Sequence, residues 1–151
     1  MSTHTATISW ARNKAAFTDL KYSRGHTWRF DGGVTVPASS SPSVVRVPLS
    51  VEAAVDPEEA FVAALSSCHM LTYLALAAKA GFVVDSYEDT AVGTMGKSAQ
   101  AKPWVAEVVL RPKIVFAGRA PTPEAHCELH ERAHHECFIA NSVKTDVRVE
   151  A

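Results

Sequence analysis

Residues 56–81 read DPEEAFVAALSSCHMLTYLALAAKAG, and the rest of the fold is arranged around this stretch. Asp56 is a favourable helix N-cap, Pro57 suits the first helical position, and Glu59 follows Asp56 at the spacing of a capping box. Gly81 can adopt the positive φ that commonly ends a helix. The stretch therefore predicts a helix of about 23 residues, roughly 35 Å long at the standard rise.

This predicted helix is apolar around most of its circumference, which indicates burial on several faces. Polar side chains such as Ser66 and His69 interrupt the apolar run, and a membrane span tolerates them poorly. We therefore interpret the stretch as a core helix. The N-terminal residues lack the apolar run and cleavage site of a secretory signal, so we expect a cytoplasmic protein.

Strand-like segments flank the helix on both sides. They predict a meander at 4–10 and 21–30, a brief edge strand at 44–49, a hairpin formed by 82–95 and 104–116, and a last strand at 143–149. A second helix is predicted over 121–140, entered through Thr122 and Pro123. This order predicts an α+β fold in which antiparallel sheets pack around a long central helix, as a single domain of residues 1–151.

The charge balance excludes two classes of partner. The 151 residues contain 15 Lys and Arg against 16 Asp and Glu, for a formal net charge of -1, and the basic residues are scattered. A chain without a basic patch has no field to attract a polyanion. We therefore expect neither nucleic acid nor a membrane as a partner.

Three cysteines in a chain without an export signal are poorly explained as a disulfide scaffold. Cys68 lies on an apolar helix face, where packing and chemistry are comparable explanations. Cys137 lies at the end of the second predicted helix, with Asn141 as a candidate left-handed cap, and we expect it to be more accessible than Cys68. The alternative is a packed cysteine beside Phe138. Cys127 is interpreted as a surface cysteine without a role.

The second predicted helix also carries a cluster of possible metal ligands. They are His126, Cys127, His130, His134 and His135. Cys127, His130 and His134 fall on one helix face, within reach of a common ion. A solvated helix face is the more common explanation of such a stretch. The sequence has no phosphate-binding loop or hydrolase motif, and neighbours such as Cys68 and His69 diverge too far on a helix to act as nucleophile and base.

The stretches VDPEEAFVAALSSC (55–68) and HHECFIANS (134–142) together resemble the OsmC/Ohr family of thiol-dependent hydroperoxide reductases. The similarity extends over nearly the whole chain from about Arg29. It implies an intertwined homodimer with its sites at the subunit interface, and reduction of organic hydroperoxides, with hydrogen peroxide used less selectively. It implies no cofactor, and a dithiol reductant of the lipoyl or thioredoxin type.

The resemblance also assigns site residues. It implies that Cys68 is the peroxidatic cysteine, Cys137 the resolving cysteine, Glu58 the glutamate of the site and Arg29 its arginine, with Arg24 as a competitor. A guanidinium would favour the Cys68 thiolate, and Glu58 could hold the guanidinium, although it lies roughly 15 Å along the helix from Cys68.

Two residues depart from the family pattern. They are His69 after the first cysteine and Phe138 after the second. An apolar lining from Phe61, Leu65 and Leu71 would favour a hydroperoxide with an organic tail. The departures keep an alternative open, a non-catalytic OsmC-like thiol sensor or small-molecule-binding protein.

Overall fold

The structure, a computed structural model, describes all residues 1–151 and divides them into two compact units, Met1–Ala60 and Phe61–Ala151. Two α-helices combine with antiparallel and mixed sheets, which confirms the α+β class. The single domain over residues 1–151 stays a prediction. Each unit is described by itself below.

The first unit contains the predicted meander. Its sheet has the order β1-β2-β3, with β1 at Ala6–Ser9, β2 at His26–Phe30 and β3 at Thr35–Ala38. The sequence did not indicate β3, which is only four residues long and contains Pro37, a residue that strands disfavour. The antiparallel register aligns Ile8 with Trp28 and Trp28 with Val36, so one apolar row crosses all three strands.

The edge strand predicted at 44–49 is wrong. The chain forms two successive turns there, in which Val44 N–H donates to the Ser41 carbonyl and Leu49 N–H donates to the Arg46 carbonyl, each at 3.0 Å. These bonds within the segment, together with Pro48, take up the groups that a strand would offer to a neighbour.

Helix α1, Pro57–Lys79, begins and ends as predicted. Glu59 N–H donates to Asp56 Oδ1 at 2.8 Å, and Asp56 N–H donates to Glu59 Oε2 at 3.1 Å, which completes the capping box. Gly81 follows the helix with a φ of 81°.

In the single chain, α1 is buried along one face, so its burial on several faces stays a prediction. The fully buried side chains form one stripe at spacings of three and four residues, namely Leu65, His69, Tyr73, Leu76 and Ala77. Leu71, on another face, is 61% exposed. By length and composition alone α1 could cross a membrane, but the core helix of a soluble protein passes the same test.

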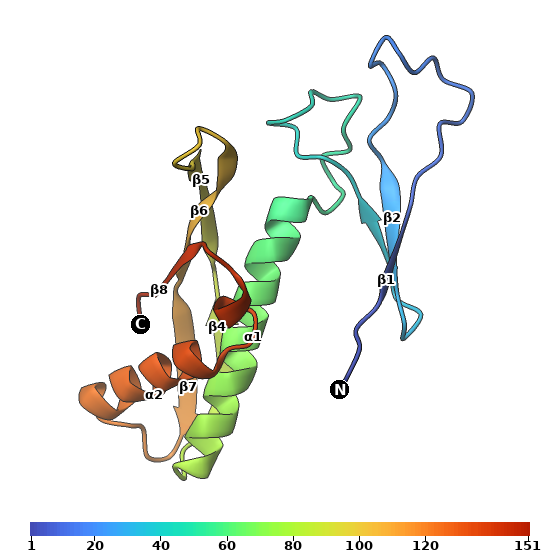
Figure 1. Cartoon of the computed structure of the whole chain (residues 1–151). Coiled ribbons are helices and arrows are strands. Elements are labelled where there is room, and N and C mark those ends of the chain that lie inside the picture. Colours follow the sequence, from blue (N-terminus) through green and yellow to red (C-terminus); the bar gives the residue numbers. More distant parts are fainter. The chain divides into compact units, whose positions relative to one another are not determined.

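The hairpin predicted after α1 is present, but each of its arms is two strands. Strands β5 (Val92–Lys97) and β6 (Pro103–Leu110) pair with each other, and β4 (Val83–Asp89) pairs with β7 (Pro112–Ala117), all antiparallel (Figure 1). The arms break where Asp89 Oδ1 accepts the Arg111 N–H at 2.6 Å. This side chain replaces a ladder bond, and Pro112 can supply none.

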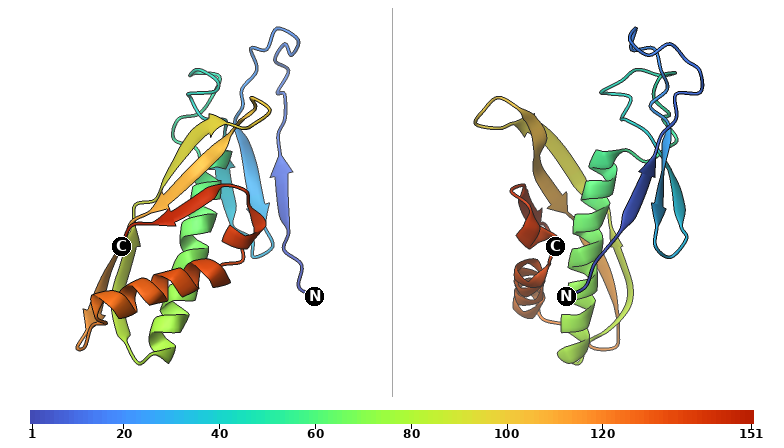
Figure 2. Two further views of the ribbon diagram at one scale, coloured as in Figure 1. Left: turned by 60° about the vertical axis from the view of Figure 1, so that its left-hand side comes forward. Right: turned by 45° about the vertical axis from the view of Figure 1, so that its right-hand side comes forward.

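The C-terminal elements complete the second unit. Helix α2, Pro123–Glu136, begins at Thr122, whose Oγ1 accepts the Ala125 N–H at 3.2 Å. It ends earlier than predicted, and Asn141 lies in a short 3₁₀ helix, η1 (Ala140–Ser142), so the left-handed cap at Asn141 is wrong. Strand β8, Asp146–Val149, then pairs with β6 in parallel (Figure 2).

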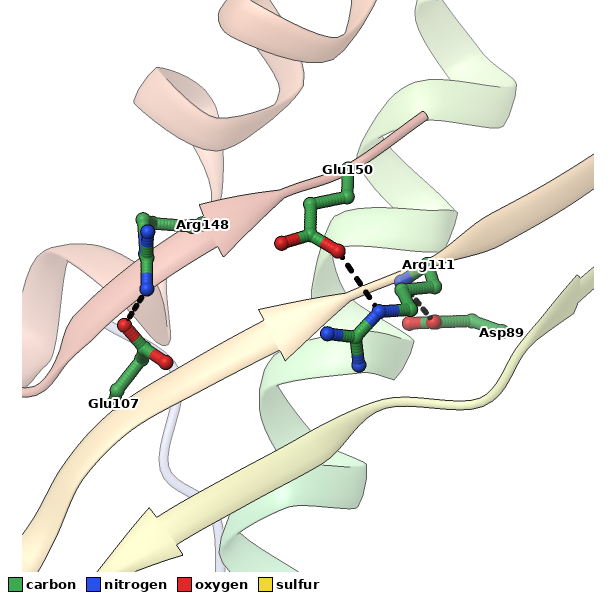
Figure 3. A network of polar contacts seen from close by, with 5 residues as sticks. All are labelled: Asp89, Glu107, Arg111, Arg148 and Glu150. Atoms are coloured by element: carbon green, nitrogen blue, oxygen red, sulfur yellow. Dashed lines mark hydrogen bonds and ion pairs between the residues drawn. The ribbon is translucent and has the colours of Figure 1, made fainter.

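Polar contacts hold β8 and its extension beside β6. Arg148 on β8 pairs with Glu107 on β6, and Arg111 Nε donates to Glu150 Oε2 at 2.9 Å (Figure 3). Both pairs are largely exposed, so they fix the register of the strand more than they stabilise the fold.

Two hydrophobic clusters form the core of this unit. In the first, Tyr73 and Leu76 of α1 pack with Leu129 and Ala133 of α2, covered by side chains of β4 and β7. In the second, Leu65 of α1 packs on β6, with β8 and the η1 region around it. The buried stripe of α1 thus serves both clusters, and Cys68 lies between the residues that contribute to them.

Candidate functional site

Two cysteines far apart in the sequence meet in the second unit. Cys68 lies in the middle of α1, and Cys137 is the residue that caps the C-terminal end of α2. Cys68 lies close enough to Cys137 to raise the pKa of its thiol, and both cysteines are free. The fold thereby brings together the two thiols that the sequence singled out.

The accessibilities of the two thiols are the reverse of the prediction. Cys137 is only 1% exposed, whereas Cys68 is partly exposed. The reason is that the chain turns inward after α2. Cys137 N–H donates to the His134 carbonyl at 3.4 Å, and Ala140 N–H donates to Cys137 Sγ, also at 3.4 Å.

The surroundings of Cys137 favour its neutral thiol. Burial and then the contact with Cys68 raise the pKa of Cys137 to about 11, and the Ala140 N–H offsets only part of this effect. At neutral pH Cys137 therefore carries its proton. A buried thiol that is protonated lies beside a more accessible one.

His69, the residue after Cys68, is turned away from the sulfur and toward α2. Its Nε2 lies 3.0 Å from Nδ1 of His130, and the two rings are stacked at 5.3 Å with an angle of 3° between their planes. One turn along α1, the Tyr73 hydroxyl lies 2.8 Å from His126 Nδ1. We call these two hydrogen-bonded pairs, Tyr73–His126 and His69–His130, the imidazole ladder.

The ladder is electrically neutral at physiological pH. His69 and His130 are 1% and 4% exposed, and burial is the main cause that lowers the pKa of His69 to about 4 and that of His130 to about 3. His134 further lowers the pKa of His69, and Asp89 opposes this effect. Neutral imidazoles can share one proton across the 3.0 Å contact, one as donor and the other as acceptor.

Sequence reasoning missed the ladder because it weighed His69 in relation to Cys68 and to the family pattern, and His126 and His130 as possible metal ligands, but never the two helices together. A signal was present, since His69 and Tyr73 stand four residues apart on one helix, as do His126 and His130 on the other. Side chains at that spacing share a helix face. Only the packing of α1 on α2 shows that the two faces meet.

The possible metal ligands of α2 do not converge. His130 Nδ1 faces His69, and the exposed Cys127 Sγ lies 3.8 Å from Glu131 Oε1. No three His, Cys, Asp or Glu side chains in the structure form a group that could hold a metal ion. The trio of Cys127, His130 and His134, which the sequence left open as an alternative, therefore does not come together as a metal site.

The two candidate arginines differ in their contacts. Arg29 is exposed on β2 and forms no ion pair. The Arg24 guanidinium, in contrast, donates to the carbonyls of Leu20 and Tyr22 and lies 3.9 Å from the centre of the Tyr22 ring. Arg24 is thus occupied by its own loop, and Arg29 is free to bind a carboxylate or a thiolate.

Glu58 is half-buried in the first turn of α1 and forms no ion pair. Its neighbour Glu59 is the residue used in the capping box. At the rise of an α-helix, Glu58 lies roughly 15 Å along the axis from Cys68, so the two side chains do not meet within this helix.

The predicted apolar lining is wrong for the single chain. Leu65 is fully buried in the second core cluster and Phe61 packs against it, while Leu71 is largely exposed on another face. A cavity of about 390 Å³ is instead lined by residues of α2 and β8, among them His126, Cys127, His130 and Val147. Neither Cys68 nor Cys137 lines that cavity.

Comparison with known proteins identifies the family. The chain aligns along 99% of its length, at 58% identity and a TM-score of 0.96, with 99% of an OsmC-like protein of unknown function from Vibrio cholerae. Two organic hydroperoxide resistance proteins share the fold. That of Elizabethkingia anophelis has 19% identity and a TM-score of 0.72 over 99% of this chain and 93% of its own. OhrB of Bacillus subtilis has 18% identity and a TM-score of 0.71 over 99% and 97%.

No curated protein matches the sequence. The family of OsmC-like proteins matches residues 50–151, which include α1, both cysteines of the site and every element of the second unit. On this match and the likeness to the Vibrio cholerae protein, the chain belongs to the OsmC-like protein family.

Proposed function

We propose that the protein is a two-cysteine peroxidase that reduces organic hydroperoxides, and hydrogen peroxide less selectively. The observation that carries the proposal is the proximity of a partly exposed Cys68 to a buried, protonated Cys137. A peroxide can approach the Cys68 thiol. The buried Cys137 thiol lies close by, where it can react with Cys68 once Cys68 is oxidised.

The chemistry balances in three steps. The Cys68 thiolate attacks the O–O bond, takes one oxygen as a sulfenic acid and releases an alkoxide, which is protonated to the alcohol. The Cys137 sulfur then attacks the Cys68 sulfur, so that an S–S bond forms, the S–O bond breaks and the Cys137 proton leaves with the hydroxide as water. An external dithiol of the lipoyl or thioredoxin type reduces the disulfide and is itself oxidised.

We assign Arg29 as the cation that favours the Cys68 thiolate, and Glu58 as the carboxylate that holds its guanidinium. A guanidinium stays charged when it is desolvated, and its planar fork fits a carboxylate. Two observations support the assignment: Arg29 lacks an ion-pair partner, whereas Arg24 is bound to its own loop.

We further propose that the protein acts as an intertwined homodimer in the cytoplasm, with α1 as its central helix. Large apolar side chains remain exposed in both units of the single chain, including Ile8 at 60% and Leu71 at 61%. Apolar surface of this kind is characteristic of a subunit interface. A second subunit would also bury the faces of α1 that are exposed here.

The decisive experiment compares wild type, Cys68→Ser and Cys137→Ser after a stoichiometric amount of cumene hydroperoxide. Wild type is expected to lose two thiols without gaining oxygen, Cys137→Ser to gain one oxygen, and Cys68→Ser to do neither at a comparable rate. Intact mass and thiol titration give these results, with Cys127→Ser as a matched control that behaves as wild type. Undiminished peroxide consumption by Cys68→Ser would exclude the mechanism.

A second candidate function is a non-catalytic thiol sensor or small-molecule-binding protein. The cavity of about 390 Å³ between α2 and β8 favours it, because this space lies apart from the two thiols of the proposed mechanism. It predicts a reactive Cys68 with no turnover of hydroperoxide in the presence of a dithiol.

A further inference from the structure

The imidazole ladder and the thiol pair connect the same two elements. On α1, His69 is the residue next to Cys68, and on α2, His130 lies two turns before Cys137. The ladder contacts are His69–His130 at 3.0 Å and Tyr73–His126 at 2.8 Å. Cys68 of α1 also lies close enough to Cys137, the capping residue of α2, to raise the pKa of its thiol.

The two hydrogen-bonded pairs, which we call the rungs of the ladder, follow each other in opposite order along the two helices. Four residues forward on α1, from His69 to Tyr73, correspond to four residues backward on α2, from His130 to His126. Each rung thus joins one turn of α1 to one turn of α2. Two hydrogen-bonded rungs fix both the sliding and the rotation of one helix against the other, which apolar contacts do less strictly because they are not directional.

The rings of the ladder make further aromatic contacts. The His130 ring stacks on Tyr73 at 4.3 Å and meets the His126 ring edge to face at 4.6 Å. Tyr73 belongs to the core cluster with Leu76, Ala77, Leu129 and Ala133, and the outer nitrogens His69 Nδ1 and His130 Nε2 have no hydrogen-bond partner. A buried polar pair whose atoms have no other partner is costly when it separates, so the pair resists displacement of the helices.

We propose that His69 and His130 are positioning residues that hold Cys137 against Cys68. The proposal rests on the peroxidase mechanism for its biological use, since resolution of a sulfenic acid needs the second sulfur in place. The ladder has no contact with the peroxide and takes no part in the first step. The ladder instead raises the probability that the Cys137 sulfur lies within reach of the Cys68 sulfur.

The test measures that probability without a peroxide. Wild type is equilibrated in glutathione redox buffers, and the fraction of Cys68–Cys137 disulfide is determined by mass spectrometry after acid trapping, in a Cys127→Ser background. This equilibrium gives the effective concentration of one thiol at the other. Each tenfold change in it corresponds to about 30 mV in the reduction potential of the pair.

Removal of the ladder contact is expected to lower the effective concentration at least tenfold. His130→Leu removes one partner, and His69→Leu/His130→Leu removes both and leaves no orphaned imidazole, which favours a folded protein. His130→Asn places a polar atom near the position of Nδ1 and is expected to restore most of the loss. Ile114→Ala, which reduces packing in the same core cluster and keeps the side chains of both ladder hydrogen bonds, is the matched control for stability and is expected to keep the wild-type value.

The outcomes separate this inference from the proposed function. A wild-type effective concentration in both leucine variants would overturn the positioning role, and so would a wild-type protein that forms no Cys68–Cys137 disulfide in the redox buffers. A peroxide-inert Cys68 in a protein whose disulfide equilibrium depends on His130 would refute the peroxidase and leave the positioning role intact. In the peroxidase, the same variants are expected to form the Cys68 sulfenic acid at the wild-type rate but to resolve it at least tenfold more slowly.

Discussion

At the scale of single residues, the adjacent residues Cys68 and His69 have different partners. Cys68 and His69 are adjacent, yet the sulfur meets Cys137 and the imidazole meets His130. Successive side chains on a helix point about 100° apart, so one turn of α1 can present a thiol in one direction and an imidazole in another. His69, which departs from the family pattern, is therefore a structural partner of α2 and not a base for the thiol.

The arginine assignment gives a prediction at this scale. Arg29→Gln is expected to slow the oxidation of Cys68 by cumene hydroperoxide about ten- to a hundredfold, because in the proposed site the Arg29 guanidinium favours the thiolate. Arg24→Gln is the matched control and is expected to stay within about twofold of wild type, since Arg24 binds its own loop. The rate of thiol loss in rapid mixing measures both, and the reverse ranking would reassign the site to Arg24.

At the scale of elements, the ends of α1 were predictable because local chemistry sets them. Asp56, Pro57, Glu59 and Gly81 act within a few residues of their own backbone, and the structure places each in its expected role. Elements that depend on distant partners were not predictable. Strand β8 pairs with β6 in parallel, each arm of the hairpin is split near the Asp89–Arg111 contact, and Cys137 is buried, all because of segments remote in sequence.

The capping box gives the prediction for this scale. Asp56→Ala removes the acceptor of the Glu59 N–H and is expected to lower the free energy of unfolding by about 1 kcal/mol. Glu52→Ala is the control, because Glu52 is exposed and lies before the helix. Urea unfolding followed by circular dichroism measures the difference, and equal stabilities of the two variants would mean that the cap contributes nothing.

At the scale of the whole molecule, the neutral ladder links stability to pH. The pKa of His69 is about 4 and that of His130 about 3, whereas both are near 6.5 when exposed. Below about pH 6.5 the two imidazoles therefore become protonated in the unfolded chain but stay neutral in the folded one. The folded state loses stability as the pH falls toward these pKa values. Above about pH 7 the two imidazoles are neutral in both states and add no further change.

The expected slope between pH 6 and pH 4.5 approaches about 1.4 kcal/mol per pH unit for each imidazole. Urea unfolding at a series of pH values measures it. The variant His69→Leu/His130→Leu is the control, and its stability should fall less steeply over the same range. Parallel curves for the variant and wild type would show that other groups, such as His126, govern the acid response.

The nesting of the two strand pairs also has a consequence for how the chain acquires this structure. The β5–β6 pair is enclosed by the β4–β7 pair, so the loop between β5 and β6 is the shortest that must close in this part of the chain. Once it has closed, β4 and β7 are brought near each other and their pairing costs little additional chain entropy. The long hairpin can therefore close from its tip, with β4 and β7 pairing after β5 and β6.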